Sequence, residues 1–238
     1  MANHQLLNNV THKNLKVITE RSALYGDNVA TVLTFPEEFR SVQGSFPICF
    51  CKDSSTEEFH SAVVFGFEDN ENLFLDGDAW TATYVPLMLE RQPFLIGQPE
   101  DNADESQLLL HIDMDSPRVS NDEGKSVFLE FGGNSPFLQH ISSVMRTIYE
   151  GRKQSRHFID MLVRHELIEA FTLNIPLDDG SNNQLLGFYT IAEEKLNGLP
   201  DQIIIDLMRN GYLQAIYMVI ASFSNFRDLI ARKNRRLC

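Results

Sequence analysis

One histidine and two aspartates at alternating positions form the motif in this sequence that is best suited to chemistry. His111, Asp113 and Asp115 are each two residues apart, and on a β-strand such residues point to the same face. A His-x-Asp pair with a second, distant histidine is the ligand set of non-haem iron oxygenases. The histidines available as that further ligand are His140, His157 and His165. The sequence therefore offers His111, Asp113 and His165 as a candidate site for iron or another divalent metal.

A polar strand face explains the same aspartates and histidine more simply. The three distant histidines lie in segments with helical periodicity, whereas the iron site of these oxygenases is closed within a barrel of strands. Few strands are expected after residue 120, too few for such a barrel. We therefore expect a solvated strand face at His111 and Asp113, with the metal-dependent enzyme as the alternative hypothesis.

Other catalytic patterns are missing or incomplete. The sequence has no Gly-x-Ser-x-Gly elbow and neither of the two glycine-rich phosphate-binding motifs. Asp76 and Asp78 flank a glycine as they would in an ordinary turn. Cys49 and Cys51 share one strand face but have no second cysteine pair to complete a zinc site. We therefore predict no catalytic residue and no cofactor, and the sequence argues against an enzyme more than for one.

Aromatic residues around a short predicted helix are the best candidates for binding a small ligand. Trp80 is the single tryptophan of the chain, and Tyr84, Arg91 and Phe94 follow it closely. A tryptophan beside a tyrosine and an arginine is a common lining for a ligand pocket. Packing in the hydrophobic core is the alternative interpretation of the same four residues.

Two kinds of periodicity predict the elements that position these residues. Short runs rich in β-branched and aromatic residues, separated by polar turns, indicate strands up to about residue 120. From residue 135 the apolar spacing becomes helical. The expected strands are 28–35, 47–52, 60–67, 72–75, 94–97 and 108–114, with a hairpin formed by 170–177 and 184–190. The expected helices are 83–92, 135–151, 152–167, 193–196, 200–209 and 212–233.

This order of elements predicts an α+β fold. We expect a mainly antiparallel N-terminal sheet, extended by the late hairpin, with a helical C-terminal half packed on it. The late hairpin can join the early sheet. We therefore expect one domain over residues 1–238, strand-rich at 28–120 and helix-rich at 135–233 with the hairpin at 170–190.

Acidic charge is concentrated in one third of the chain. The 238 residues include 20 Lys and Arg against 33 Asp and Glu, for a net charge of -13. Residues 53–123 contain 17 acidic and 2 basic residues. We call residues 53–123 the acidic stretch. Such a balance argues against binding to nucleic acid or an anionic membrane. The sequence predicts that a protein partner docks on the acidic stretch, for which charge reversal at Glu57, Glu58, Asp101 and Asp104 would be the test.

No segment of the chain is expected to enter a membrane. The N-terminus is polar and lacks the pattern of a secretory signal. The longest apolar run, 212–223, has about a dozen residues, whereas a spanning helix needs about 20. Three cysteines do not make a disulfide framework, which favours a reducing compartment. The sequence therefore predicts a soluble, cytoplasmic protein.

Several longer strings resemble the bacterial SapC family of soluble proteins, over about residues 29–233. They are Phe46–Lys52, Asn72–Trp80, Tyr84–Pro86, Arg91–Phe94, Gly187–Leu196, Leu199–Asp201 and Gly211–Arg227. The family is named from a locus for a paracrystalline surface layer and is distinct from the peptide-transport permease of the same name. The resemblance implies a role in cell-envelope or surface-layer biology or in nutrient uptake. It implies no catalytic residues.

Together these observations predict an accessory protein that binds a protein or a small ligand and is not an enzyme. The alternatives are the metal-dependent enzyme with His111 and Asp113, and a structural component of a surface layer.

Overall fold

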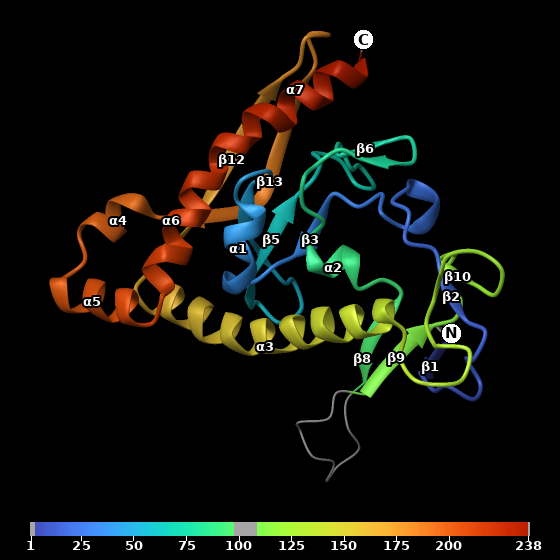
Figure 1. The fold of residues 1–238 in the computed structure, drawn as a ribbon. Helices are drawn as coiled ribbons and strands as arrows, with labels where there is room; N and C mark the ends of the chain where they lie inside the picture. The colour runs from blue at the N-terminus through green and yellow to red at the C-terminus, as the bar shows by residue number, and fades with distance from the viewer. Residues whose placement is uncertain (1–2, 98–108, 238) are drawn as a thin grey trace. The chain divides into compact units, whose positions relative to one another are not determined.

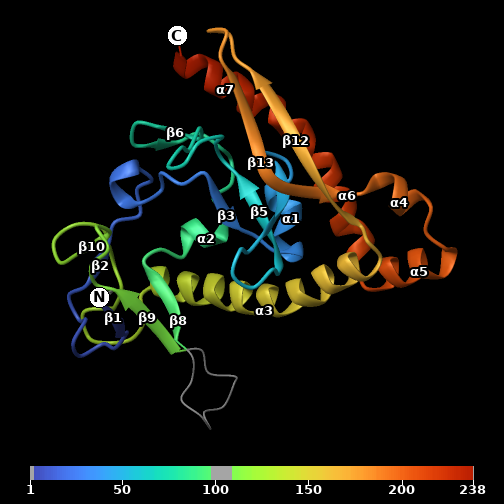
Figure 2. The same ribbon diagram turned by 180° about the vertical axis from the view of Figure 1, so that it is seen from behind.

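A computed structural model describes residues 3–97 and 109–237 of the chain (Figures 1 and 2). The chain divides into two compact units, which we describe separately. The first unit comprises Met1–Asp27, Gly77–Trp80 and Leu87–Glu150, and the second comprises Asn28–Asp76, Thr81–Pro86 and Gly151–Cys238. The expectation of one domain over 1–238 stays a prediction.

The first unit is built on two small antiparallel sheets. Their strand orders are β1-β9-β8 and β10-β2-β11. The strands of this unit are β1 (His4–Leu6), β2 (Lys16–Val17), β7 (Ala79–Trp80), β8 (Phe94–Gly97), β9 (Leu109–Asp113), β10 (Val119–Ser120) and β11 (Lys125–Ser126). Its helices are η1 (Ala23–Tyr25), α2 (Leu87–Glu90) and the part of α3 (Pro136–Arg164) up to residue 150. The core of the unit includes Phe94, Ile112 and Ile141, all of them buried.

The second unit contains a five-stranded antiparallel sheet with the order β12-β13-β4-β5-β3. Its strands are β3 (Thr31–Leu33), β4 (Ile48–Lys52), β5 (Phe59–Val64), β6 (Leu75–Asp76), β12 (Ile168–Pro176) and β13 (Asn182–Ile191). Its helices are α1 (Pro36–Val42), the rest of α3, α4 (Glu193–Asn197), α5 (Asp201–Arg209), α6 (Tyr212–Ser222), η2 (Phe223–Asn225) and α7 (Phe226–Leu237).

The β12–β13 hairpin reaches well beyond the rest of this sheet. Only Phe188 and Tyr189 of β13 pair with β4. The remaining length is covered on one face by the α6–α7 segment, which runs beside the hairpin in both ribbon views (Figures 1 and 2). Phe171 of β12 contacts the rings of Phe223 and Phe226 at centroid distances of 5.1 and 6.2 Å. The fold is α+β with antiparallel sheets and a late hairpin, as the sequence predicts.

The predicted helix 83–92 is wrong in its extent. The structure has helix only at Leu87–Glu90. Proline has no amide hydrogen and disfavours a helical conformation in the residue before it, so the helix does not extend back through Pro86.

The predicted division of the helical region at Gly151 is also wrong. α3 is a single helix of 29 residues that continues through this glycine. Gly151 faces the ring of Phe35, and a Cβ atom at Gly151 would collide with that ring. The glycine therefore serves close packing within the second unit and does not end a helix.

Two more differences concern the start of α1 and the continuity of the last long helix. No helix was expected directly after the predicted strand 28–35, but Pro36 begins α1, a position that suits its fixed φ angle. The expected helix 212–233 is interrupted by η2, and side chains at this point form hydrogen bonds with the backbone of residues 43–48. Ser222 Oγ accepts a hydrogen bond from Ile48 N at 2.9 Å, and Asn225 Nδ2 donates to the carbonyls of Gln43 and Phe46.

Among residues 3–97 and 109–237, no single helix is both long and apolar enough to cross a membrane. Asp201–Arg209 and Tyr212–Leu237 meet the length and hydropathy criteria only when taken together, with a bend of 91° between them.

Candidate functional site

Two of the residues predicted to bind a metal, His111 and Asp113, contact nearby residues of the first unit in the structure. The half-buried ring of His111 on β9 covers Gly97 of β8, where a Cβ atom would collide with it. Asp113 Oδ1 accepts a hydrogen bond from Asp115 N at 3.1 Å. His165 follows α3 in the other unit. Within the described residues, no three His, Cys, Asp or Glu side chains are grouped so that they could hold a metal ion. The metal site therefore gains no support from the structure.

The predicted ligand-binding residues fall in both units. Trp80, Arg91 and Phe94 belong to the first unit and Tyr84 to the second. Arg91 Nη1 donates to the carbonyl oxygen of Phe94 at 2.7 Å, and the buried Phe94 ring lies 6.0 Å from the ring of Phe137. These contacts are typical of a packed turn. Their role in ligand binding stays a prediction.

Tyr84 belongs to a small buried polar cluster in the second unit. Its hydroxyl donates to Glu38 Oε1 at 3.1 Å, and Thr34 Oγ1 donates to Glu38 Oε2 at 2.7 Å. Glu38 is almost fully buried on α1. Because both carboxylate oxygens of Glu38 accept hydrogen bonds within the fold, we interpret this cluster as structural.

Two cysteines and a histidine lie close together on β4 and β5. Cys51 is the cross-strand partner of His60, and Cys49 is two residues before Cys51. Burial raises the pKa of Cys51 to about 11 and raises that of Cys49 as well. Burial also lowers the pKa of His60. The negative charge of Asp53 acts to raise this pKa, but burial has the larger effect. At neutral pH the cluster therefore holds protonated thiols beside a neutral imidazole, which is not an activated nucleophile.

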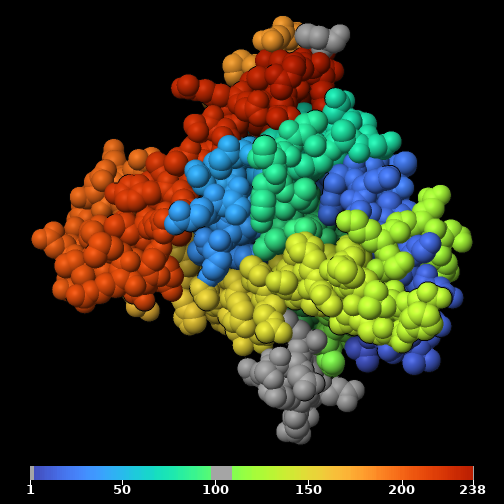
Figure 3. Space-filling model, viewed as in Figure 1, coloured from blue at the N-terminus to red at the C-terminus, as the bar shows by residue number. Residues whose placement is uncertain are grey.

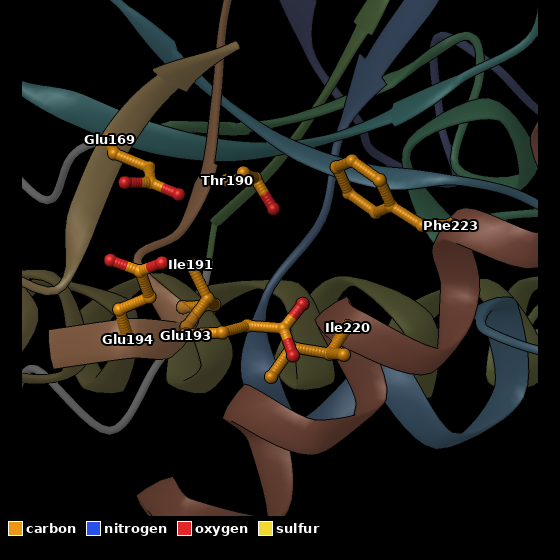
Figure 4. A pocket seen from close by; sticks show the side chains of 7 residues that line it. All are labelled: Glu169, Thr190, Ile191, Glu193, Glu194, Ile220 and Phe223. Atoms are coloured by element: carbon orange, nitrogen blue, oxygen red, sulfur yellow. The ribbon is translucent and has the colours of Figure 1, made fainter. Parts of the chain in front are cut away.

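The candidate binding site is a pocket of about 370 Å³ in the second unit. Glu169 and Thr190 face each other across the paired strands β12 and β13. Figure 4 shows the carboxylates of Glu169 and Glu194 on the same side of the pocket, opposite the ring of Phe223. The full set of lining residues is Glu169, Thr190, Ile191, Glu193, Glu194, Ile220 and Phe223.

Each wall of the pocket follows from a local feature of the sequence. Ile191 is the buried last residue of β13, and the chain turns directly into α4. Glu193 and Glu194 then occupy the first turn of α4, where acidic side chains also favour the helix dipole. The ring of Phe223 packs against the rings of Phe171 and Phe226, with centroid distances of 5.1 and 5.3 Å. The apolar side of the pocket is therefore well supported.

Among the described residues, no cation is paired with the carboxylates of this pocket. Within the part of the chain that is described, neither Glu169 nor Glu193 nor Glu194 forms an ion pair. The nearby cation Lys195 is instead bound to Glu166, with Nζ 2.8 Å from Oε2. The three carboxylates are not grouped to hold a metal ion. A larger cation that places an ammonium or guanidinium between them, and an alkyl stem against Phe223, is the chemical match.

The sequence did not predict this pocket. Its residues come from β12, β13, α4, α6 and η2, and no single spacing joins them. The only local hint was the pair Glu193–Glu194 directly after a strand of the predicted hairpin.

The acidic stretch is partly neutralised within the fold. Glu57 pairs with Lys52, and Glu68 and Glu71 both pair with Lys233. Glu90 contacts His140 at 2.7 Å. Asp101 and Asp104 lie outside the described residues.

Comparison with known proteins assigns most of the chain to one family. The family model described as SapC matches residues 7–229. No curated protein and no solved structure shows a significant match.

Proposed function

Because the chain belongs to the SapC family, we propose that it is an accessory binding protein, and that the pocket between β12, β13, α4 and α6 receives a cationic side chain of a partner protein. The observation that carries this proposal is the set of three carboxylates that lie beside an apolar wall and have no ion-pair partner among residues 3–97 and 109–237. The link to the cell envelope, surface layer or nutrient uptake, and the cytoplasmic location, belong to the same proposal.

Lysine and arginine side chains combine the two properties that match this pocket, an apolar stem and a positive charge. Their alkyl stems pack on apolar surfaces while the charged end stays polar. A cation near the face of Phe223 would also be attracted by the aromatic ring. The volume of about 370 Å³ is in the range of small-ligand pockets. The pocket therefore has room for one side chain of a bound polypeptide, and its charge favours a cationic one.

The excess charge of the acidic stretch supports the same class of partner. Long-range attraction between an acidic protein and a basic partner accelerates their association and weakens with added salt. Asp76 and Asp78 are exposed, so they can contribute to this attraction. The alternative of a metal-dependent enzyme is not proposed, since the ligand geometry described above gives it no support.

Titration of the full-length protein with short peptides, followed by NMR, tests the pocket. We expect Gly-Arg-Gly and Gly-Lys-Gly to shift the amide signals of residues near 169, 190–194 and 220–223, and Gly-Gln-Gly to leave them in place. Glu194→Gln should weaken the binding about three- to tenfold, because it removes one charged hydrogen-bond acceptor.

Asp201→Asn is the matched control for this titration. Asp201 lies in the first turn of α5 as Glu194 lies in that of α4. Both substitutions therefore remove one favourable interaction with a helix dipole, but only Glu194 lines the pocket. Equal binding by Glu194→Gln and the native protein, or equal shifts with Gly-Gln-Gly, would contradict the proposal.

A further inference from the structure

The C-terminal half of α7 is attached to the second unit mainly by polar contacts. Lys233 Nζ donates to Glu68 Oε1 at 2.7 Å and to Glu71 Oε1 at 2.6 Å. Only 9% of the Lys233 side chain and 13% of the Glu71 side chain are exposed, against 59% for Glu68. This lysine is thus a nearly buried charge whose partners both come from the acidic stretch.

Two arginines on either side of Lys233 contact the same segment. The Arg232 guanidinium lies 4.4 Å from the centroid of the Phe74 ring, and its Nη1 donates to Thr81 Oγ1 at 2.8 Å. Arg236 Nη2 donates to the carbonyl oxygens of Asn72 and Leu75. Figure 3 shows α7, in red, packed against this blue-green segment. Three basic residues of one helix end therefore contact residues 68–75 and Thr81 of the same unit.

Apolar contacts hold only the first part of α7. Phe226 and Leu229 are buried, but after Leu229 the only buried residue is Lys233 among those described. Ile230 is half-buried and Leu237 is 44% exposed. The two halves of the helix are therefore attached by different forces, and the second half can detach without exposing much apolar surface.

We propose that residues 230–237 form a latch that opens and closes as one body over residues 68–75 and Thr81 while the rest of the second unit stays folded. In its closed state the latch pairs with the carboxylates of Glu68 and Glu71, which belong to the acidic stretch expected to meet a basic partner. The latch thus competes with a basic partner for that part of the acidic stretch.

Lys233 makes the opening cooperative. Burial by itself would lower the pKa of Lys233, but hydrogen bonds from its ammonium group to Glu68 and Glu71 outweigh burial and raise the pKa. The side chain is therefore charged when it is docked. Separating it from one carboxylate alone would leave a poorly compensated buried charge, so the lysine leaves both carboxylates together.

Hydrogen exchange on the full-length protein measures the opening directly. We expect amides 231–236 to exchange through an opening at least about tenfold more populated than the one that exposes β4 and β5. Lys233→Met keeps most of the side-chain length without the charge and should increase exchange of the same amides about tenfold further, with β4 and β5 unchanged. Equal protection of the latch and of β4 and β5 in the native protein would overturn the proposal.

A charge-swap series separates this latch from general destabilisation. Lys233→Glu alone, and Glu68→Lys with Glu71→Lys, should each open the latch, because like charges then face each other. The triple variant should restore protection of amides 231–236, since the attraction is re-established with reversed signs. Arg227→Gln is the control on the exposed face of the same helix. A triple variant as open as its parents would contradict the proposal.

Binding of an oligolysine peptide tests the covering role of the latch. Lys233→Met should bind hexalysine about threefold more tightly than the native protein, because Glu68 and Glu71 become available. Equal affinity of the two proteins would refute that role.

Discussion

Arg118 and Asp27 are 91 positions apart in the sequence and form an ion pair that is closed off from solvent. Arg118 Nη2 lies 2.5 Å from Asp27 Oδ2, and the two side chains are 1% and 0% exposed. Asp27 also accepts hydrogen bonds from Arg21 Nη1 and from Ser22 N. Arg118 Nη1 donates to the carbonyls of Ile18 and Glu20 at 3.0 and 2.7 Å, and Nε donates to Gln92 Oε1 at 3.4 Å. This network joins the N-terminal segment of the first unit to the chain around β10.

Removal of one member of this buried network should destabilise the protein strongly. We expect Asp27→Asn to lower the free energy of unfolding by about 3–5 kcal/mol, because two arginines then lose their counter-charge in a buried site. Urea denaturation followed by circular dichroism measures the loss. Lys195→Met is the control, since its ion pair with Glu166 is exposed and should contribute less than about 1 kcal/mol. Similar losses in the two variants would contradict the structural role of the network.

Gly151→Ala should destabilise the second unit although alanine is the better helix former. Alanine would gain about 1 kcal/mol in helix propensity, but its Cβ would collide with the ring of Phe35. Crowding of this kind in a packed core costs about 1–3 kcal/mol, so we expect a net loss. Gly44→Ala is the control, because a Cβ at Gly44 meets no atom within 4 Å. A more stable Gly151→Ala protein in thermal denaturation would show that Phe35 can move aside.

The two described cysteines should react poorly with thiol reagents in the native protein. Burial raises the pKa of Cys51 to about 11, so only about one thiol in a thousand is ionised at pH 8. In a Cys238→Ser background we expect slow reaction of both Cys49 and Cys51 with Ellman's reagent. Addition of guanidinium chloride should make both react at once. Rapid stoichiometric reaction of the native protein at pH 8 would mean that β4 is more accessible than the structure indicates.

Glu68 should contribute to an acid-dependent loss of stability. The hydrogen bond and charge of Lys233 lower the pKa of Glu68 below its ordinary value. A carboxylate with a lowered folded-state pKa stabilises the protein above its unfolded pKa of about 4.3, and this contribution is lost as the pH falls through the folded value. We therefore expect Glu68→Gln to reduce the pH dependence of the unfolding midpoint between about pH 5 and 3.

Glu130→Gln is the control for this acid series, because Glu130 is exposed in a turn of the first unit. An identical pH profile for Glu68→Gln and the native protein would show that the contact with Lys233 contributes nothing to stability. The contribution should be small, because more than half of the Glu68 side chain is exposed.

Elements with a strong local pattern could be predicted from the sequence. The β12–β13 hairpin was expected from two alternating runs around a polar loop, and β4, β5, β8 and β9 from short apolar runs. By contrast, β2, β10 and β11 have two residues each, which is too short for any periodicity. Gly151 was misinterpreted because glycine ends helices and also permits close packing, and only the position of Phe35 distinguishes the two roles.

The candidate site was harder to predict than the fold. The sequence drew attention to His111 and Asp113 because a motif search detects only neighbours in the chain. The structure instead places Glu169, Glu194 and Phe223 around one pocket, and these residues have no common spacing.

The sequence by itself determined the SapC family, the α+β class and the concentration of acidic charge, because these depend on composition and on patterns within a few residues. The tertiary structure decided which partner each charge has. Glu68 and Glu71 are indistinguishable from their acidic neighbours in the sequence, but folding brings them to Lys233, more than 160 residues away. Glu169, Glu193 and Glu194 receive no such partner from the part of the chain that the structure describes. The physical reason is that a charge is neutralised by whatever lies within a few ångströms of it, and only the folded chain sets those distances.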